Sequence, residues 1–336
     1  MTEPSAMDPP HFVKQQQGVA LITILLVVVI ATVLGVSMMT DQHFAINRAR
    51  TFFDQGIVHQ YALGGEELAR QILHQDFIDE PTVDHKGENW AATNLRFDFG
   101  QGEVEVLIED LQSRLNLNSL AENGANPSLA KQRLSSLLAE QSLDGSYADR
   151  ILDWIDLNSS VSSLGAEDYD YLGLARPYRT ANTLMVDLSE LRLILEMDRE
   201  KFDQLAPFVA TIGDPNIDIN VNTAAPQVLQ AIIPGLSFSA AESIVIDRDE
   251  RGGYQSKSDL DGEIANLGLR FVSDGLSVQS NFFQVSVRAR FQDRYGYLTS
   301  IVQRDPNDGT LRVIYRDQGK KVRPFIAVDQ EENNNG

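Results

Sequence analysis

A cluster of side chains with oxygen ligands lies near the middle of the sequence. Three of its aspartates are spaced i, i+4 and i+7 on one face of a predicted helix, and an amide and further carboxylates follow in a polar stretch. Calcium takes about six to eight oxygen ligands from carboxylates, amides and backbone carbonyls, so this segment has the chemistry of a calcium site. The spacing is not that of an EF-hand. The cluster comprises Asp149, Asp153, Asp156, Asn158, Glu167, Asp168 and Asp170.

A purely structural role for these residues stays open. Carboxylates along a helix face are commonly solvated, and Asp153 in particular could cap a loop or pair with a cation. The chain carries 48 Asp and Glu against 28 Lys and Arg, a net charge of −20, so a bound cation would relieve local repulsion. The same acidity repels nucleic acid, and no nucleic-acid partner is expected.

Other catalytic chemistry is poorly represented. The absence of cysteine excludes disulfides, cysteine–zinc sites and thiol catalysis. No Ser/His/Asp arrangement is visible, and no glycine-rich phosphate loop follows a predicted strand. The sequence therefore predicts a protein without enzymatic activity. The five histidines are His11, His43, His59, His74 and His85.

The chain that carries the acidic cluster begins with a long apolar segment. Val19–Met39 has 21 residues without a charge, which at about 1.5 Å per residue cross a hydrocarbon core of about 30 Å. A cleaved secretory signal has a shorter apolar region of about 7–15 residues and a more basic start than one Lys14. Helical periodicity continues to about Phe77, Gly64-Gly65 could bend this helix, and Pro81 bars its continuation.

Two separated regions alternate apolar and polar residues as antiparallel strands do. Residues 96–108 are typical of a hairpin around Gly100-Gln-Gly102, and residues 281–315 contain three further strands separated by turns. This order predicts an α+β protein in which a large helical domain is inserted between strands of one sheet. Within residues 112–275, helices are predicted at Pro127–Gln141, Tyr147–Leu157, Val186–Met197, Arg199–Phe208, Ala224–Ile233 and Ser239–Glu250.

The N-terminal segment resembles that of a type IV pilin or pseudopilin. Lys14-Gln-Gln-Gln-Gly18 precedes the apolar run and its amphipathic continuation. The resemblance implies that a prepilin peptidase cleaves between Gly18 and Val19 and that Val19 is then N-methylated. Most members have glutamate at the fifth mature position, where it offsets the buried amine of the neighbouring subunit; this chain has Thr23. A subunit with no other subunit above it has no amine to neutralise and needs no charged side chain in the lipid. The alternative is that Thr23 reflects ordinary sequence drift at one helix position.

Four phrases of the remaining sequence resemble the K-type minor pseudopilin of the type II secretion system. The likeness extends from Gln17 to about Asp317. It implies a pilin-like fold with a long N-terminal helix, whose halves are transmembrane and amphipathic, an antiparallel sheet and a large all-helical inserted domain. The phrases are Ile108–Leu120, Asp153–Asp156, Gly165–Asp168 and Ile219–Leu229.

The resemblance also sharpens the metal prediction. Calcium is a known constituent of the helical domain in this family, and we therefore expect Asp156, Asn158, Glu167 and Asp168 to be its ligands.

The family likeness implies a role in protein export. The expected protein is a single-pass protein of the inner membrane with a periplasmic head. It would form a tip complex with I-, J- and H-type minor pseudopilins, contact the major pseudopilin and cap the pseudopilus that exports folded proteins across the outer membrane. The alternative is an anchored periplasmic protein that binds calcium or a partner outside any filament.

The predicted organisation follows the chain in seven segments. These are a leader at 1–18, a transmembrane and stalk helix at 19–78, the first part of the head at 79–111, a helical insert with the acidic loop at 112–213, a second helical, hairpin-containing subdomain at 214–275, head strands at 276–318 and a disordered tail at 319–336.

A helix-hairpin-helix pattern lies in the second helical subdomain. Residues 232–237, Ile-Ile-Pro-Gly-Leu-Ser, precede the apolar periodicity of residues 241–248. DNA-binding versions present hairpin amides to phosphates, but here Ser237 replaces the second glycine and Glu242 and Asp247 lie nearby. We expect a hairpin that packs two helices.

Overall fold

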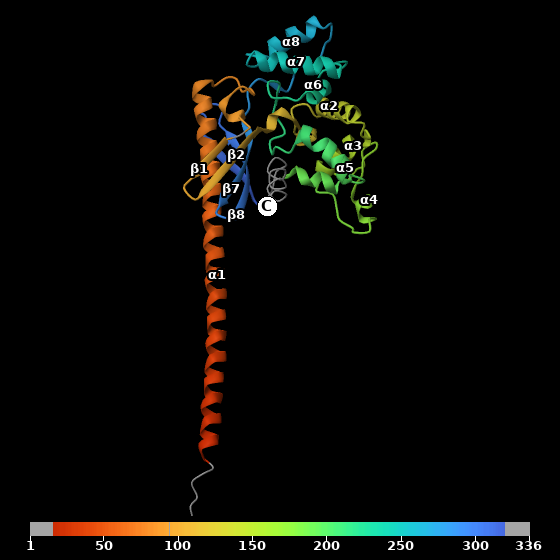
Figure 1. The fold of residues 1–336 in the computed structure, drawn as a ribbon. Coiled ribbons are helices and arrows are strands. Elements are labelled where there is room, and N and C mark those ends of the chain that lie inside the picture. Colours follow the sequence, from red (N-terminus) through yellow and green to blue (C-terminus); the bar gives the residue numbers. More distant parts are fainter. Residues whose placement is uncertain (1–15, 94, 320–336) are drawn as a thin grey trace, which may run out of the picture. The chain divides into compact units, whose positions relative to one another are not determined.

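The computed structural model describes residues 16–93 and 95–319. The chain divides into two units, residues 1–57 and 58–336, and helix α1 (Gln16–Asp79) begins in the first and ends in the second (Figure 1). The predicted leader and tail lie outside the described residues, except for Gln16–Gly18 and Gly319.

The first unit is the apolar part of α1. Within the described residues, one helix is long and apolar enough to span a membrane, and its apolar side chains are exposed from Val19 onward. Its threonine side chains bond to the helix itself: the hydroxyl of Thr32 donates to the carbonyl of Val28 at 2.8 Å. The backbone and these hydroxyl groups are therefore satisfied without water, as a lipid environment requires.

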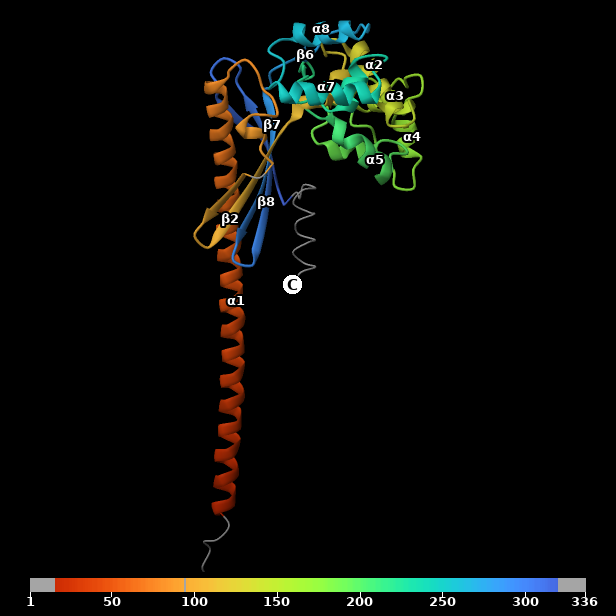
Figure 2. The ribbon, with the colours of Figure 1, turned by 45° about the horizontal axis from the view of Figure 1, so that its top comes forward.

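The second unit contains an antiparallel five-stranded sheet with strand order β1-β2-β7-β8-β9. Figure 2 shows these strands beside the last turns of α1. The strands of the two predicted regions thus join in one sheet, because β2 pairs with β7 from Gly102↔Phe291 to Asp110↔Phe283. The strands are β1 (Leu95–Phe99), β2 (Gly102–Asp110), β7 (Phe282–Phe291), β8 (Arg294–Arg304) and β9 (Leu311–Gln318).

The last turns of α1 cover one face of this sheet. Val58, Ala62, Ala69 and Leu73 are buried against apolar side chains of β2, β7 and β8. α1 runs through the glycine pair without a break, so the expected bend is absent. Gly65 instead allows close packing, because a Cβ there would lie 2.6 Å from the nearest side-chain carbon on β2.

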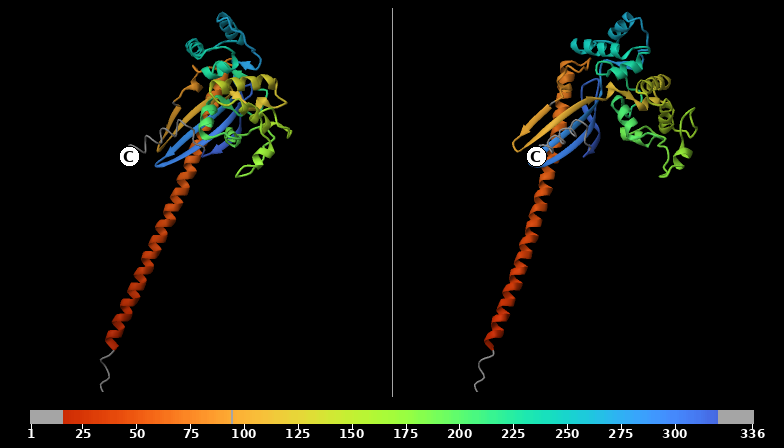
Figure 3. Two further views of the ribbon diagram at one scale, coloured as in Figure 1. Left: turned by 90° about the vertical axis from the view of Figure 1, so that its right-hand side faces the viewer. Right: turned by 45° about the vertical axis from the view of Figure 1, so that its right-hand side comes forward.

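The helical insert leaves the sheet after β2 and returns to it before β7. Figure 3 shows its helices gathered in one body beside the sheet. It has a separate apolar core, and it also contains two parallel pairs of two-residue strands, β3 (Leu115–Asn116) with β4 (Val209–Ala210) and β5 (Ile219–Asn220) with β6 (Leu276–Ser277). Its helices are α2 (Pro127–Glu140), α3 (Ser146–Ile155), α4 (Asp168–Leu172), α5 (Arg199–Leu205), α6 (Pro226–Ile232), α7 (Phe238–Glu250) and α8 (Lys257–Asn266).

Two parts of the insert differ from the prediction. The helix expected at Val186–Met197 is only a 3₁₀ segment, η4 (Leu188–Leu193), which ends because the backbone of Ile194 is extended, with a ψ of 136°. The helix α8 was not predicted. It is polar and buries only Leu260 and Ile264, so its apolar periodicity is weak, although a capping box marks its start.

Candidate metal centre

An aromatic cluster fixes the two segments that carry the acidic residues. Trp154, near the end of α3, makes edge-to-face contacts with Tyr171 of α4 and with Tyr178, with ring centroids 5.5 and 6.3 Å apart. Trp154 and Tyr171 are buried, and the carbonyl of Trp154 accepts a hydrogen bond from the amide of Asn182. The end of α3 and the start of α4 are therefore held side by side, which brings their carboxylates together.

Three carboxylates converge at this junction. Asp153, Asp156 and Glu167 each offer an oxygen atom within 4.8 Å of the other two. They are nearly inaccessible to solvent, with exposures of 0, 6 and 3%. No ion pair to a lysine or arginine is recorded for any of the three among the described residues, so nothing there compensates their negative charges.

The hydrogen bonds of these carboxylates leave oxygen atoms free for a ligand. Asp153 accepts the amide N–H of Ser162 with both oxygens, at 3.2 and 3.1 Å, and Asp156 Oδ1 accepts the amide of Asn158 at 3.0 Å. Glu167 Oε2 accepts the hydroxyl of Thr180, but Glu167 Oε1 is buried and accepts no hydrogen bond within the described part of the chain. A buried acceptor without a donor costs about 1–3 kcal/mol.

Gly165 leaves the space that Asp153 occupies. A Cβ at this position would lie 1.8 Å from Asp153 Oδ2. Any side chain at residue 165 would therefore displace that carboxylate or the loop that carries the glycine.

Electrostatics favours a cation at this place. Burial raises the pKa of Asp153, Asp156 and Glu167 above the ordinary carboxyl values, and the charges of neighbouring carboxylates act in the same direction. A divalent cation reverses this effect, because it stabilises the ionised form of every ligand. The arrangement can therefore hold a hard divalent cation with oxygen ligands, completed by backbone carbonyls or water.

The structure divides the four predicted ligands into two groups. Asp156 and Glu167 lie in the three-carboxylate group, whereas Asp168 is engaged by Arg179 Nη1 at 2.8 Å and by the amide and hydroxyl of Thr180. Asn158 is exposed, and its side-chain oxygen accepts the amide of Ser160.

Asp153 belongs to the acidic cluster found in the sequence but was not among the four expected ligands, and a cap or a salt bridge was the alternative role for it. It does cap the loop, through Ser162, and its carboxylate also faces Asp156 and Glu167. The i, i+3 spacing of Asp153 and Asp156 at the end of a helix is the signal that pointed to both, since such residues lie on one face.

The residues predicted for processing lie in the first turns of α1. Gly18 and Val19 are helical, and Val19 is exposed. The hydroxyl of Thr23 donates within its own helix, to the carbonyls of Val19 at 3.1 Å and Ala20 at 2.9 Å. Thr23 thus needs no partner from another chain.

The helix-hairpin-helix segment is a packing unit. Gly235, with a φ of +83°, turns the chain between α6 and α7. Arg248, the cation best placed to assist a phosphate, is fully buried and donates to the carbonyls of Val221 and Ala224. The guanidinium therefore stabilises the insert.

Comparison with known proteins identifies the family. Two family models, both described as type II secretion system protein K, match residues 113–214 and 219–285. Type II secretion system protein K of Pseudomonas aeruginosa is 37% identical over 328 residues, covering 94% of this chain and 96% of that protein. The chain belongs to the type II secretion system protein K family. The protein K of Aeromonas hydrophila is 29% identical and covers 91% of this chain.

A solved structure agrees with this membership and with the fold. The crystal structure of the GspK–GspI–GspJ complex from enterotoxigenic Escherichia coli contains a chain that matches with a TM-score of 0.71 and 25% identity, over 82% of this chain and 100% of that one. The predicted fold class is confirmed: a protein K chain with a long N-terminal helix, an antiparallel sheet and inserted helices. The apolar helix fits a single-pass inner-membrane anchor with a periplasmic head.

Proposed function

We propose that this protein K is a minor pseudopilin of the tip complex that caps the periplasmic pseudopilus. The observation that carries the proposal is likeness along nearly the whole chain, 94% of it, to a named protein K. The names of the relatives describe a secretion component and no enzyme, and the proposal includes no catalytic activity. The pseudopilus would then drive folded proteins across the outer membrane.

The position at the cap is supported by Thr23. Threonine is uncharged, so the fifth mature position cannot offset the amine of a subunit above it. Its hydroxyl is satisfied by carbonyls of its own helix and needs no partner there. The inserted helices also add bulk to the head, which favours a subunit that ends a filament.

The partners follow from the same likeness. The matching crystal structure is a complex of GspK with GspI and GspJ, and we propose I- and J-type minor pseudopilins as the direct neighbours of this chain. The H-type and major pseudopilins would follow below, and a prepilin peptidase would process the chain.

Mass spectrometry of the N-terminus tests the proposal. Protein extracted from the membrane should begin at N-methylated Val19, because prepilin peptidase cuts after Gly18. An intact Met1, or a cut near residue 40, would indicate a plain anchor or a secretory signal and would exclude a filament subunit.

We further propose that Asp153, Asp156 and Glu167 bind calcium in the insert. Support comes from their convergence, from the unsatisfied Glu167 Oε1 and from the lack of a compensating lysine or arginine among the described residues. The ion would fix the long connection between α3 and α4.

Calorimetric titration with Ca²⁺, after treatment with a chelator, tests the ligand set. We expect Asp156→Asn and Glu167→Gln to lower the affinity at least about tenfold, because each removes a direct charged ligand. Asp168→Asn should have a smaller effect, since Arg179 and Thr180 already engage that side chain. Glu200→Gln on α5 is the control. Unchanged affinity in both of the first two variants would remove this site.

A further inference from the structure

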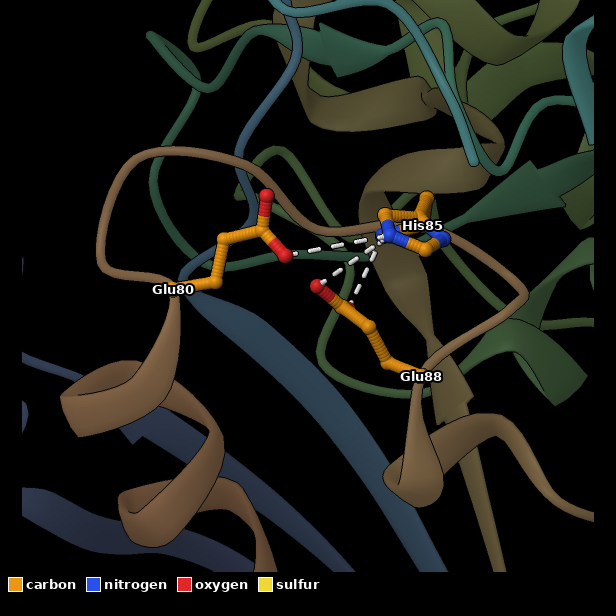
Figure 4. A group of neighbouring side chains, drawn as sticks. All are labelled: Glu80, His85 and Glu88. Carbon is orange, nitrogen blue, oxygen red and sulfur yellow. Dashed lines mark hydrogen bonds and ion pairs between the residues drawn. The ribbon is translucent and has the colours of Figure 1, made fainter. Parts of the chain in front are cut away.

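A second group of potential ligands lies in the loop that follows α1. His85 Nε2 is 4.0 Å from Glu80 Oε2 and 3.8 Å from Glu88 Oε1. One ligand atom from each residue lies within 4.8 Å of the others, and Figure 4 shows both carboxylates turned toward the imidazole ring. An ion at the centre of such a triangle lies about 2.2–2.8 Å from each atom, close to the zinc–ligand distances of about 2.0–2.2 Å.

Glu88 supplies an independent indication of a missing ligand. Its side chain is 8% exposed, and Oε2 accepts hydrogen bonds from the indole of Trp90 at 2.5 Å and from the amide of His85 at 3.0 Å. Oε1 is buried, points toward His85 and accepts no hydrogen bond within the described residues. A cation beside Oε1 would satisfy this buried atom.

Arg304 pairs with two carboxylates near this group and not with Glu88. Asp76, Asp84 and Glu88 form an overlapping group of carboxylates, and Arg304 donates to Asp84 and, at 3.1 Å, to Asp76. Among the described residues, Arg304 makes no hydrogen bond or ion pair with Glu88. One guanidinium therefore pairs with two of the three carboxylates, and Glu88 is left without an arginine partner.

The loop after α1 is fixed by contacts with the insert, and a cavity lies beside it. The amide of Asp84 donates to the carbonyl of Val278 at 2.9 Å, and His85 packs under Gly253, where a Cβ would lie 3.0 Å from the Cβ of His85. A cavity of about 280 Å³ lies next to Glu80 and Glu88, which gives room for water to complete a coordination shell.

Metal binding requires a change in the tautomer of His85. Its Nδ1 accepts the amide of Gly87 at 3.0 Å, which places the proton of the neutral ring on Nε2. Coordination through Nε2 moves this proton to Nδ1 and gives up the Gly87 hydrogen bond. Gly87 is exposed, so its amide can donate to water in place of the ring nitrogen, and the free energy of this exchange is small beside that of a zinc site.

We propose that Glu80, His85 and Glu88 bind a divalent transition-metal ion of the zinc class. An imidazole with two carboxylates favours zinc over calcium, because calcium takes oxygen ligands. The ion ties the loop after α1 at the place where it meets the insert.

The test uses the full processed protein in detergent, treated with a chelator and titrated with Co²⁺ as a spectroscopic probe and Zn²⁺ as a competitor. We expect one Co²⁺ per chain with visible absorption, displaced by Zn²⁺. His85→Gln, which preserves bulk, and Glu88→Gln should each lower the affinity at least about tenfold. His59→Ala, at a histidine of α1 outside the group, is the control. Circular dichroism confirms that each variant is folded.

Two outcomes would overturn this site. One is Co²⁺ binding of unchanged affinity in His85→Gln. The other is no Co²⁺ binding in the wild type, which would make the group a histidine–carboxylate ion pair only. The site is separable from the calcium proposal, because Glu167→Gln should leave Co²⁺ binding intact and His85→Gln should leave Ca²⁺ binding intact.

Discussion

At the scale of single residues, buried carboxylates fall into compensated and uncompensated kinds. Glu66 on α1 is compensated: Arg316 of β9 donates to both its oxygens, at 2.8 and 2.6 Å, and the hydroxyl of Ser300 donates as well. Asp153, Asp156 and Glu167 lack such a partner among the described residues. A buried carboxylate with an arginine partner stabilises the fold by itself. Buried carboxylates without such a partner are candidate ligands of a cation.

Glu66 gives a prediction about acid stability. Burial raises its pKa, but the hydrogen bonds and charge of Arg316 outweigh burial, and the net pKa lies below the ordinary 4.5. The stabilisation is therefore complete above pH 4.5 and is lost as pH falls through the folded-state pKa. Glu66→Gln should lower the free energy of unfolding at pH 7 by about 1–3 kcal/mol, as measured by urea denaturation. The deficit should shrink well below pH 4.5; an equal deficit at both pH values would contradict this account.

The sequence predicted the region of the candidate metal centre better than it predicted the residues that come together there. The composition of residues 149–170 indicated oxygen ligands, and two of the four expected side chains, Asp156 and Glu167, do face each other. Asp168 is occupied by residues 11 and 12 positions later in the chain, Arg179 and Thr180. Such a contact depends on tertiary packing and leaves no mark in local spacing.

At the scale of elements, a glycine of α1 itself is one of the residues that allow this helix to pack closely on the sheet. A Cβ at Gly65 would lie 2.6 and 2.7 Å from side-chain carbons of Val104 and Val287, whereas a Cβ at Gly64 meets nothing within 4 Å. A side chain is therefore tolerated at Gly64 and not at Gly65, a difference that the sequence alone does not reveal.

This inequality predicts opposite effects of the same substitution. Gly64→Ala should raise the free energy of unfolding by up to about 1 kcal/mol, because alanine favours a helix over glycine. Gly65→Ala should lower it by about 1–3 kcal/mol through overpacking. Thermal or urea denaturation of the two variants side by side measures the difference; equal shifts of the same sign would show that the helix does not approach the sheet so closely.

Strands and helices with a strong apolar periodicity were predicted correctly, and those with a weak one were not. The strands were located from alternation alone, since one face of the sheet is buried under α1. α8 was missed because only Leu260 and Ile264 face the core, and the helix expected at 186–197 ends early because the backbone of Ile194 is extended. Both errors arise where local propensity is weak and tertiary context decides.

At the scale of the whole chain, the insert joins two strands that are neighbours in the sheet. Asp110 of β2 pairs with Phe283 of β7, so the entry and exit of the insert lie side by side. The insert and the sheet also have separate apolar cores. A small apolar cluster, which includes Ile212 of the insert and Phe282 of β7, lies between them. Polar contacts also join them, because Asp110 accepts hydrogen bonds from Thr223 and Asn220.

Replacement of residues 112–280 by a short glycine-containing turn should leave a folded sheet. We expect a circular dichroism spectrum with more strand and a cooperative unfolding transition, because α1 and the sheet keep their own core. The free energy of unfolding should fall by at least about 2 kcal/mol, since the buried Asp110 loses the hydrogen bonds donated by the side chains of Asn220, Thr223 and Ser280. Loss of cooperative unfolding would show that the insert is required for the sheet to form.

The pairing of β2 with β7 also has a kinetic consequence during synthesis. Asp110 and its partner Phe283 are 283 − 110 = 173 positions apart, and at about 5–20 residues per second a ribosome needs about 10–35 s to make the intervening chain. For that time β2 lacks its inner partner and presents open backbone groups to other strands. Glu103, Glu105 and Glu109 alternate along β2, and these charges discourage pairing with a second nascent chain while the insert is made.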